Sequence, residues 1–330
     1  MATLLGTPSV PRRTALDLGS GVSFGAGHHF TAAPQADITA LAQEATVPLS
    51  VIKQVTKRCN FDCSFCSEVL QLPDPSLAQL ETMRDNLKGV KRVFLSGGEP
   101  LLREDFGDIV DMYADEGFII GVPTNATKGL QHAKRIVGKV AFMNIGLEGP
   151  RATTNRVRGD YDQVMAGVRA LREAGLPLSL SAVVYRSTLT ALPFTYQIAD
   201  TLDAGKLKLI MPLRKGNALK LEENEFITDQ EAADTFLRLR ELRAVHAWTP
   251  ALRLTTWTPE NEGHMIVVEP TGAANAWPVY DAKDLFEPLG NVLREPVTEI
   301  WRRYRFKENH FAKYLGRSIR STDHAGASGA

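Results

Sequence analysis

Short apolar runs alternate with amphipathic segments through the middle of the chain. Each run has four to seven residues, the length of a buried strand, and several segments between them repeat apolar positions with the period of a helix. The pattern predicts helices that include residues 105–116 and 161–174. Strands are predicted at residues 49–55, 92–95, 118–122, 142–145, 178–184 and 207–210.

The alternation of strands with helices predicts an α/β fold built on parallel strands. Right-handed crossovers between parallel strands close such a pattern into a barrel or partial barrel, here a partial (β/α)6 barrel. Functional residues of such barrels lie at the carboxyl ends of the strands. Four segments follow predicted strands directly and are expected to meet on one face: a loop with three cysteines, then residues 96–100, 124–125 and 146–149.

Changes in composition and hydrophobic pattern divide the chain into four parts. Residues 1–48 are rich in small and polar residues and are expected to form a loose or surface-wrapping extension. Residues 49–222 carry the barrel pattern, and residues 223–316 are expected to form a small C-terminal module with a helix at 229–245 and a strand at 265–268. Residues 317–330 have almost no large apolar side chains and are predicted to be a disordered tail.

Charge and composition narrow the range of partners. The 38 Lys and Arg residues balance 38 Asp and Glu residues, so the overall field does not steer the protein to nucleic acid or to an anionic membrane. No apolar run reaches the roughly 20 residues that span a bilayer, and no secretory signal pattern begins the chain. We therefore predict a cytoplasmic protein without nucleic-acid or membrane partners.

The three cysteines are the most informative residues. Cys59, Cys63 and Cys66 lie within eight residues, which excludes a disulfide framework. Thiolates are the preferred ligands of iron-sulfur clusters, and three of them leave one iron of a cubane open for chemistry. A zinc site is an alternative, but it normally needs four ligands and no histidine lies near the triad in the sequence. Three unrelated buried cysteines are the other alternative.

Residues 59–66 resemble the signature loop of the radical S-adenosylmethionine (radical SAM) superfamily. The resemblance implies a radical SAM partial barrel in which Cys59, Cys63 and Cys66 hold one 4Fe-4S cluster and SAM binds beside it. An aromatic residue precedes the last cysteine in that family, and Phe65 fits, which implies contact with the adenine of SAM. Ordinary packing of Phe65 is the alternative.

A second motif of that family stands about thirty residues further on. Its glycines, Gly97 and Gly98, allow the backbone to approach a ligand closely, and Glu99 before Pro100 can accept the ammonium of SAM. Thr124 and Asn125 resemble the Thr-Asn-Gly that lines the SAM site in many members, although Ala126 replaces the glycine. A strand-capping turn is the alternative for this pair.

Residues 146–151 and 155–159 resemble a Ser-Leu-Asp-Gly-Pro stretch and a downstream Arg-Gly of the branch associated with SPASM domains. Two residues depart from it: Gly146 stands for the serine that reaches SAM, and Glu148 stands for the aspartate. These departures leave open how the ribose is held. Arg158 is predicted to pair with the SAM carboxylate in the bidentate manner of guanidinium groups, or else to be a surface arginine.

The C-terminal module resembles a SPASM or twitch domain at residues 269–272, 289–292 and 297–301. Members with that module bind auxiliary clusters through cysteines, and this chain has no cysteine after Cys66. We therefore expect one cluster only, and a module that shapes or covers the substrate pocket. Trp257, Trp277 and Tyr280 are candidate pocket walls, although each is more typical of core packing.

The resemblance implies reductive cleavage of SAM to a 5′-deoxyadenosyl radical that abstracts hydrogen, with an electron donor such as flavodoxin or ferredoxin. Epimerisation, oxidation, elimination and decarboxylation all stay open, and no catalytic residue for them is assigned. The first hypothesis is a small polar substrate, such as a sugar or nucleoside intermediate of natural-product biosynthesis. A ribosomally made peptide is the second hypothesis, and a non-enzymatic metal-binding module the third. Polar residues on late strands are candidates to hold a substrate carboxylate or phosphate: Lys208, Arg214, Lys215 and Asn217.

Overall fold

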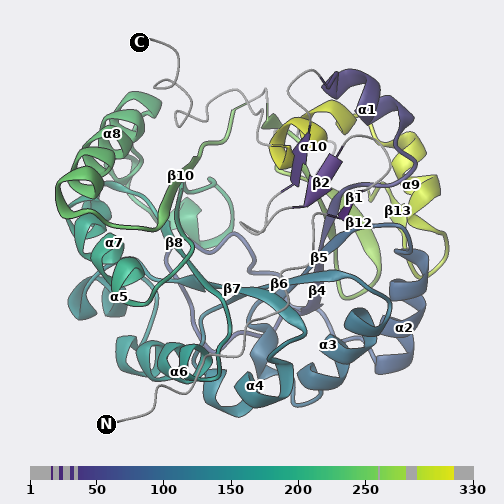
Figure 1. Ribbon diagram of the computed structural model, residues 1–330, viewed down its shortest axis with the longest axis horizontal. Helices are drawn as coiled ribbons and strands as arrows, with labels where there is room; N and C mark the ends of the chain where they lie inside the picture. The colour runs from purple at the N-terminus through teal and green to yellow at the C-terminus, as the bar shows by residue number, and fades with distance from the viewer. Residues whose placement is uncertain are drawn as a thin grey trace, which may run out of the picture.

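The fold is built on one ten-stranded sheet, curved into an open barrel with helices on its outer face (Figure 1). The computed structural model describes residues 16–17, 22–24, 30–32, 36–258, 261–279 and 288–315. The strand order across the sheet is β10-β9-β8-β7-β6-β5-β4-β11-β12-β13. The predicted partial barrel is therefore confirmed.

All six predicted strands form, and neighbours in the sequence pair in parallel. Their bounds are β4 (Ser50–Thr56), β5 (Arg92–Gly97), β6 (Ile119–Thr124), β7 (Val140–Gly146), β8 (Leu178–Val183) and β9 (Lys206–Ile210). The helices that connect them include α2 (Leu77–Asn86), α3 (Phe106–Asp115), α4 (Gly129–Ile136), α5 (Arg151–Val157), α6 (Tyr161–Glu173) and α7 (Leu192–Thr201). Helices α2, α3, α4 and α6 follow one another along the outside of the sheet in Figure 1.

The C-terminal part of the chain adds strands to both edges of this sheet. After α8 (Asp229–His246), strand β10 (Ala251–Thr255) pairs in parallel with β9. Strand β11 (Met265–Val268) then pairs in parallel with β4, and β12 (Ala273–Trp277) and β13 (Gly290–Asn291) follow as antiparallel strands. The expected helix and strand of this part are present, and the domain boundary at residues 222 and 223 stays a prediction.

Segments from the two ends of the chain pack together. Helix α1 (Ile38–Glu44) contacts α10 (Lys307–Tyr314), and the Trp301 indole on α9 (Val297–Arg303) donates to the Ala45 carbonyl at 2.8 Å. Strands β1 (Leu16–Asp17), β2 (Val22–Phe24) and β3 (Phe30–Ala32) form a separate small sheet. The predicted tail lies outside the described residues.

Side chains on successive strand positions point to opposite faces, and the two faces differ in character. The outer face is a continuous apolar layer under the helices, with Val51, Val93, Ile120, Leu180 and Leu207 all fully buried. The inner face of β7, β8 and β9 includes a group of polar residues and a glycine. Neighbouring positions there form one row of Gly146, Ser181 and Lys208. Asn144 pairs with Ser179 in a second row, and Lys206, two residues before Lys208, points to the same face.

In the part of the chain that the structure describes, no helix combines the length and apolar character that a membrane span requires.

Candidate active site

The three cysteines lie on the loop that follows β4, at the carboxyl ends of the strands. Cys63 is buried, Cys66 is partly buried and Cys59 is exposed. Burial raises the pKa of all three thiols, to about 12 for Cys63, and neighbouring thiols add to the rise for Cys59 and Cys63. No three His, Cys, Asp or Glu side chains among the described residues are placed to hold a single metal ion.

Residues after β9 hold this loop in place. The Asn217 side-chain amide donates to Asp62 Oδ1 at 2.6 Å and to the Cys63 carbonyl at 3.1 Å, and its backbone N–H donates to the Cys66 carbonyl at 2.8 Å. Gly216 has a φ of +57°, and a Cβ there would lie 2.4 Å from the Cys66 carbonyl oxygen. Asn217 therefore supports the cysteine loop, a different role from the substrate ligand expected from the sequence.

The two glycines after β5 allow two backbone segments to touch. A Cβ on Gly97 would lie 2.1 Å from the Thr56 carbonyl oxygen, and one on Gly98 would lie 2.4 Å from the Arg58 carbonyl oxygen. The Glu99 N–H donates to that Arg58 carbonyl at 2.8 Å. The glycine motif thus fixes the start of the cysteine loop against the loop that carries Glu99, and Pro100 then begins a short 3-10 turn.

Glu99 is the centre of a buried hydrogen-bond network. Its carboxylate accepts from the Thr124 hydroxyl at 2.6 Å, from the Asn125 N–H at 2.6 Å and from the Leu101 N–H at 3.0 Å. Burial raises the pKa of Glu99 to about 6, against the lowering effect of these bonds. The Asn125 side chain continues the network to Asn60 Oδ1 at 2.9 Å. The two predicted motifs and the cysteine loop are therefore one connected unit.

Glu148 and Arg158 form a bidentate ion pair beside the cysteines. The Arg158 Nε donates to Glu148 Oε2 at 2.6 Å and its Nη2 donates to Oε1 at 2.7 Å, with Glu148 fully buried. The guanidinium also lies 5.0 Å from the centre of the Phe65 ring. A Cβ on Gly146 would lie 2.4 Å from the Arg158 guanidinium carbon, so the missing serine is explained by the space that Arg158 occupies. Pairing of Arg158 with the SAM carboxylate stays a prediction.

Sequence reasoning missed Tyr185, which follows β8. Its hydroxyl lies 3.1 Å from the Ser64 hydroxyl, and its ring centre lies 6.2 Å from that of Phe65. Burial raises its pKa to about 12. A tyrosine 121 residues after Ser64 gives no local signal in the sequence.

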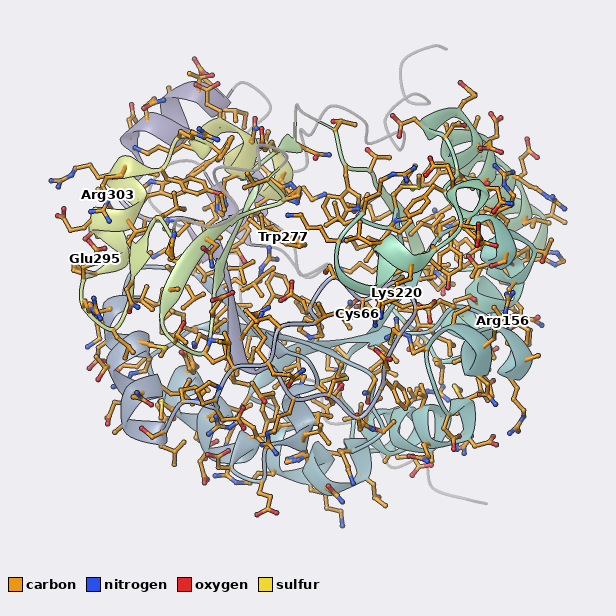
Figure 2. All side chains as sticks on the ribbon, turned by 180° about the vertical axis from the view of Figure 1, so that it is seen from behind. Cys66, Arg156, Lys220, Trp277, Glu295 and Arg303 are labelled. Carbon is orange, nitrogen blue, oxygen red and sulfur yellow. The ribbon has the colours of Figure 1, made fainter. Side chains whose placement is uncertain are left out.

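The other candidate residues have different surroundings. Arg214 pairs with Glu223 on the exposed surface, while Lys215 Nζ lies 4.5 Å from the centre of the Trp277 ring. The Trp257 indole donates to the Met211 carbonyl. Tyr280 lies outside the described residues. In Figure 2, Cys66, Lys220 and Trp277 lie toward the centre of the molecule, and Lys220 Nζ donates to Asn217 Oδ1 at 3.0 Å.

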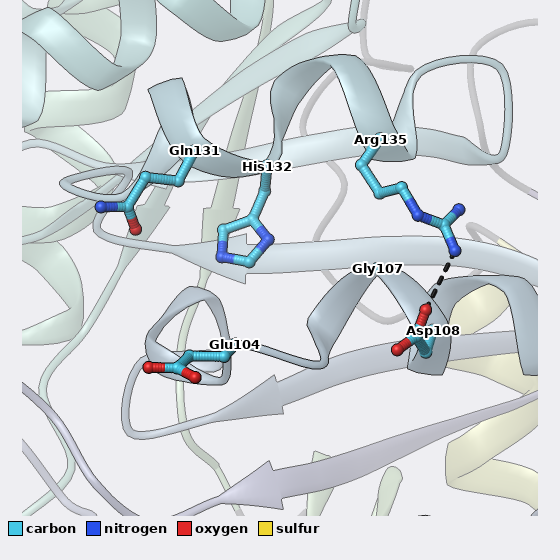
Figure 3. Close-up of a pocket in the computed structure, with 6 residues that line it drawn as sticks. All are labelled: Glu104, Gly107, Asp108, Gln131, His132 and Arg135. Carbon is cyan, nitrogen blue, oxygen red and sulfur yellow. Dashed lines mark hydrogen bonds and ion pairs between the residues drawn. The ribbon is translucent and has the colours of Figure 1, made fainter.

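A hollow on the outer surface is a separate feature. It lies between α3 and α4, where Arg135 reaches across to Asp108 at 3.0 Å (Figure 3). The buried His132 ring is hydrogen-bonded to the Leu101 carbonyl at 3.0 Å. The hollow lies in the helical layer and has no cysteine, so we do not assign it to the active site. Its lining residues are Glu104, Gly107, Asp108, Gln131, His132 and Arg135.

Residues 54–189 match the model of the radical SAM superfamily. This part of the chain is therefore similar to the radical SAM domain, and members of that superfamily use a 4Fe-4S cluster and SAM.

Individual relatives and a solved structure extend this finding. The PqqA peptide cyclase of Rhodopseudomonas palustris is 32% identical over 197 residues, covering 54% of this chain and 51% of that protein. The AdoMet-dependent heme synthase of Nitratidesulfovibrio vulgaris is 22% identical over 295 residues, covering 79% of each chain. Streptococcus suis SuiB bound to precursor peptide SuiA superposes with a TM-score of 0.67 at 12% identity, covering 86% of this chain and 69% of that one.

These comparisons bear on the substrate as well as on the class. The chain spans about half the length of the PqqA peptide cyclases that it matches. The predicted sugar or nucleoside gains no support from the two relatives or from SuiB, whereas the peptide alternative fits two of these three names better.

Proposed function

We propose that this protein cleaves SAM reductively and uses the resulting radical to modify a ribosomally made peptide. The connection of the cysteine loop to Glu99 through Asn125 and Asn60 is the observation that carries the SAM-cleaving part. The peptide part is supported by the names of the PqqA peptide cyclases and by the fold shared with SuiB.

The residues present fit one iron-sulfur cluster. Three thiols on one loop satisfy three irons of a cubane, and the chain has no fourth cysteine to close the site. When bound, the cluster supplies one electron to SAM held at the open iron. Cys59, Cys63 and Cys66 would hold the cluster, and the open position is the one that SAM needs.

The surrounding residues orient SAM and keep water away from it. Glu99 keeps one free lone pair, on Oε2, for the SAM ammonium, while its three hydrogen bonds fix the carboxylate in place. Phe65 offers a ring face to the adenine, and the adjacent Tyr185 closes the side of the site near Ser64. The Glu148–Arg158 pair fills the space beside Gly146, which limits water at the end of β7.

An open barrel favours a long substrate. Strands β10 and β11 stand at the two ends of the parallel series, and no pairing joins them among the described residues. A peptide enters through a lateral opening more readily than through a closed barrel mouth. The flavodoxin or ferredoxin expected from the sequence remains our proposal for the electron donor.

The experiment reconstitutes the full chain anaerobically with iron and sulfide, then adds dithionite and SAM. We expect about four irons per chain and 5′-deoxyadenosine formation. Cys63→Ala should lose both, and Lys134→Ala on the outer face of α4 should lose neither. Zinc in place of iron, or iron without SAM cleavage, contradicts the first part of the proposal.

The substrate part is tested by the stimulation of SAM cleavage. Pools of ribosomal-type peptides are compared with sugars, nucleosides and carboxylated porphyrins at equal concentration. We expect stimulation and a mass change of substrate with peptides alone. Stimulation by porphyrins instead would favour the second candidate, a heme precursor, for which the 79% coverage of the heme synthase is the specific observation. Stimulation by nucleosides would contradict both.

A further inference from the structure

Lysines of β9 point into the barrel on the polar part of its inner face. Lys208 is in register with Ser181 and, one strand further, with Gly146, while Lys206 is two residues before Lys208 and so points to the same face. Adjacent strands lie about 4.8 Å apart, so the Lys208 backbone is about 10 Å from Gly146. Since Arg158 beside the cysteines packs on Gly146, Lys208 stands level with the edge of the SAM site.

A third lysine reaches the same region from another element. Lys313 on α10 is close enough to Lys208 for the Lys208 charge to lower its pKa, although burial is the larger cause; burial is also the first cause that lowers the pKa of Lys208. The pKa is lowered to about 8 for Lys208 and for Lys206, and to about 7 for Lys313. Arg92 adds positive charge from the start of β5.

Within the part of the chain that the structure describes, no carboxylate compensates these lysines. Lys206, Lys208 and Lys313 form no ion pair or hydrogen bond with any described residue, and Lys206 Nζ only faces the Phe142 ring at 5.1 Å. The neighbouring polar groups are satisfied by each other, because the Ser179 hydroxyl donates to Asn144 Oδ1 at 3.0 Å and the Asn144 amide donates to Ser181 Oγ at 3.2 Å. Three lysines without an anion are unfavourable in a partly buried interior.

The charged and titratable groups that face this cluster are all cationic or neutral. Among the described residues, Arg92 on β5 and Arg253 on β10 act on the lysines of β9, His264 is affected by Lys313 and Lys208, and His310 lies next to His264. Burial lowers the pKa of His310 to about 3, so it adds no charge near neutral pH. These arginines and the three lysines would therefore attract an anion from outside the protein.

An apolar floor lies beneath the lysines. The Phe94 and Phe142 ring centres are 5.8 Å apart, and the Arg92 guanidinium lies 4.8 Å from the Phe94 ring. Gly121 lies on β6, between the strands β5 and β7 that carry the two rings, and it leaves room for both, since a Cβ there would lie 2.7 Å from Phe142. A floor of this kind suits the aliphatic part of a ligand whose charged end reaches the lysines.

We propose that Lys208 and Lys313, with Lys206, bind the carboxylate of an acidic residue of the peptide substrate and hold that residue beside the SAM site. The inference rests on the proposed function, because it takes the substrate to be a peptide. It names a specificity element that the cysteine and Glu99 motifs do not contain. Both a glutamate or aspartate side chain and a C-terminal carboxylate have the required chemistry.

The test measures lysine accessibility site by site in the reconstituted full chain. Lysines are labelled with acetic anhydride at pH 7.5, and the rate at each one is read by mass spectrometry. N-acetylglutamate amide, N-acetylglutamine and N-acetylglutamine amide are the probes, so that a side-chain carboxylate, a C-terminal carboxylate and a neutral isostere are compared. Exposed Lys134 on α4 is the internal control.

We expect at least a threefold slower labelling of Lys208 and Lys313 with one of the acidic probes, and no change with the neutral probe or at Lys134. The acidic probe that protects identifies the source of the carboxylate. Equal protection by all three probes, no protection by any, or no labelling of Lys208 without a probe would each overturn the inference.

A variant separates binding from local damage. Lys208→Met should remove the protection of Lys313, and Lys208→Arg should restore it. Because the labelling requires no SAM cleavage, its result is independent of the 5′-deoxyadenosine assay. Cleavage without protection refutes the carboxylate site alone, and protection without cleavage refutes the proposed function alone.

Discussion

Removing the charge of Glu148 should expose the energetic role of the buried ion pair. Glu148→Gln keeps the size of the side chain but leaves the Arg158 guanidinium, whose side chain is only 13% exposed, without a carboxylate. Breaking a buried pair by removing one partner costs about 3–5 kcal/mol, because the remaining charge is neither hydrated nor compensated. For a domain of this size that corresponds to a fall in melting temperature of roughly 10 °C.

The assay is thermal unfolding of wild type and variant under anaerobic conditions, with and without reconstituted cluster. The matched control is Glu223→Gln, which breaks the bidentate pair with Arg214 on the exposed surface and should leave the midpoint unchanged. Adding Arg158→Met to Glu148→Gln removes both charges and should restore part of the lost stability.

Two results would refute this reasoning. A Glu148→Gln midpoint within about 2 °C of wild type means that the guanidinium is hydrated or has another partner. A double variant no more stable than Glu148→Gln means that Arg158 acts through packing, and that its charge is not the source of the cost.

Three further predictions follow from the geometry of the site. Gly146→Ser, which restores the residue of the resembled motif, should displace Arg158 from its pair, and its cost should not add to that of Glu148→Gln in a melting experiment. Gly216→Ala should lower the iron bound per chain, because its Cβ would lie 2.4 Å from a carbonyl oxygen of the cysteine loop. The control Gly117→Ala, at a glycine with a φ of +81° and no atom within 4 Å of the added Cβ, should bind as much iron as wild type. Equal iron in the two variants would contradict the steric argument. Burial raises the pKa of Glu99 to about 6 from 4.5, so protonated Glu99 stabilises the folded state below pH 4.5, and this stability is lost as pH rises through 6. The free energy of unfolding should fall by about 2 kcal/mol over this range. Urea unfolding at several pH values should show this fall in wild type and not in Glu99→Gln.

The fold could largely be predicted from the sequence, because its first six parallel strands are short apolar runs that alternate with segments of helical patterning. Predicted and observed strand ends agree within about two residues, the usual uncertainty of such boundaries. Strand β10 was missed because Arg253 interrupts its short apolar pattern, and β12 because residues 273–276 are three alanines and an asparagine. Both strands depend on pairing with a neighbour more than on their own residues.

The sequence predicted those parts of the site whose residues are close together in the chain, and it missed contacts between residues that are far apart. The cysteine spacing and the glycines before Glu99 predicted a loop that the structure joins into one network. The support from Asn217 comes from 155 residues beyond Asp62, and no spacing rule connects the two. Only the structure explains why residue 146 is a glycine, because it places the Arg158 guanidinium in the space that a side chain would need.

The long reach of Asn217 has a consequence for how the protein is made. The cysteine loop leaves the ribosome well before the residues that support it, and at about 10 residues per second the interval is roughly 15 s. During that interval the nascent thiols have neither their hydrogen bonds to residue 217 nor the barrel around them. The hydrogen bonds that hold the cysteine loop can therefore form only after residue 217, which follows β9, has been synthesised.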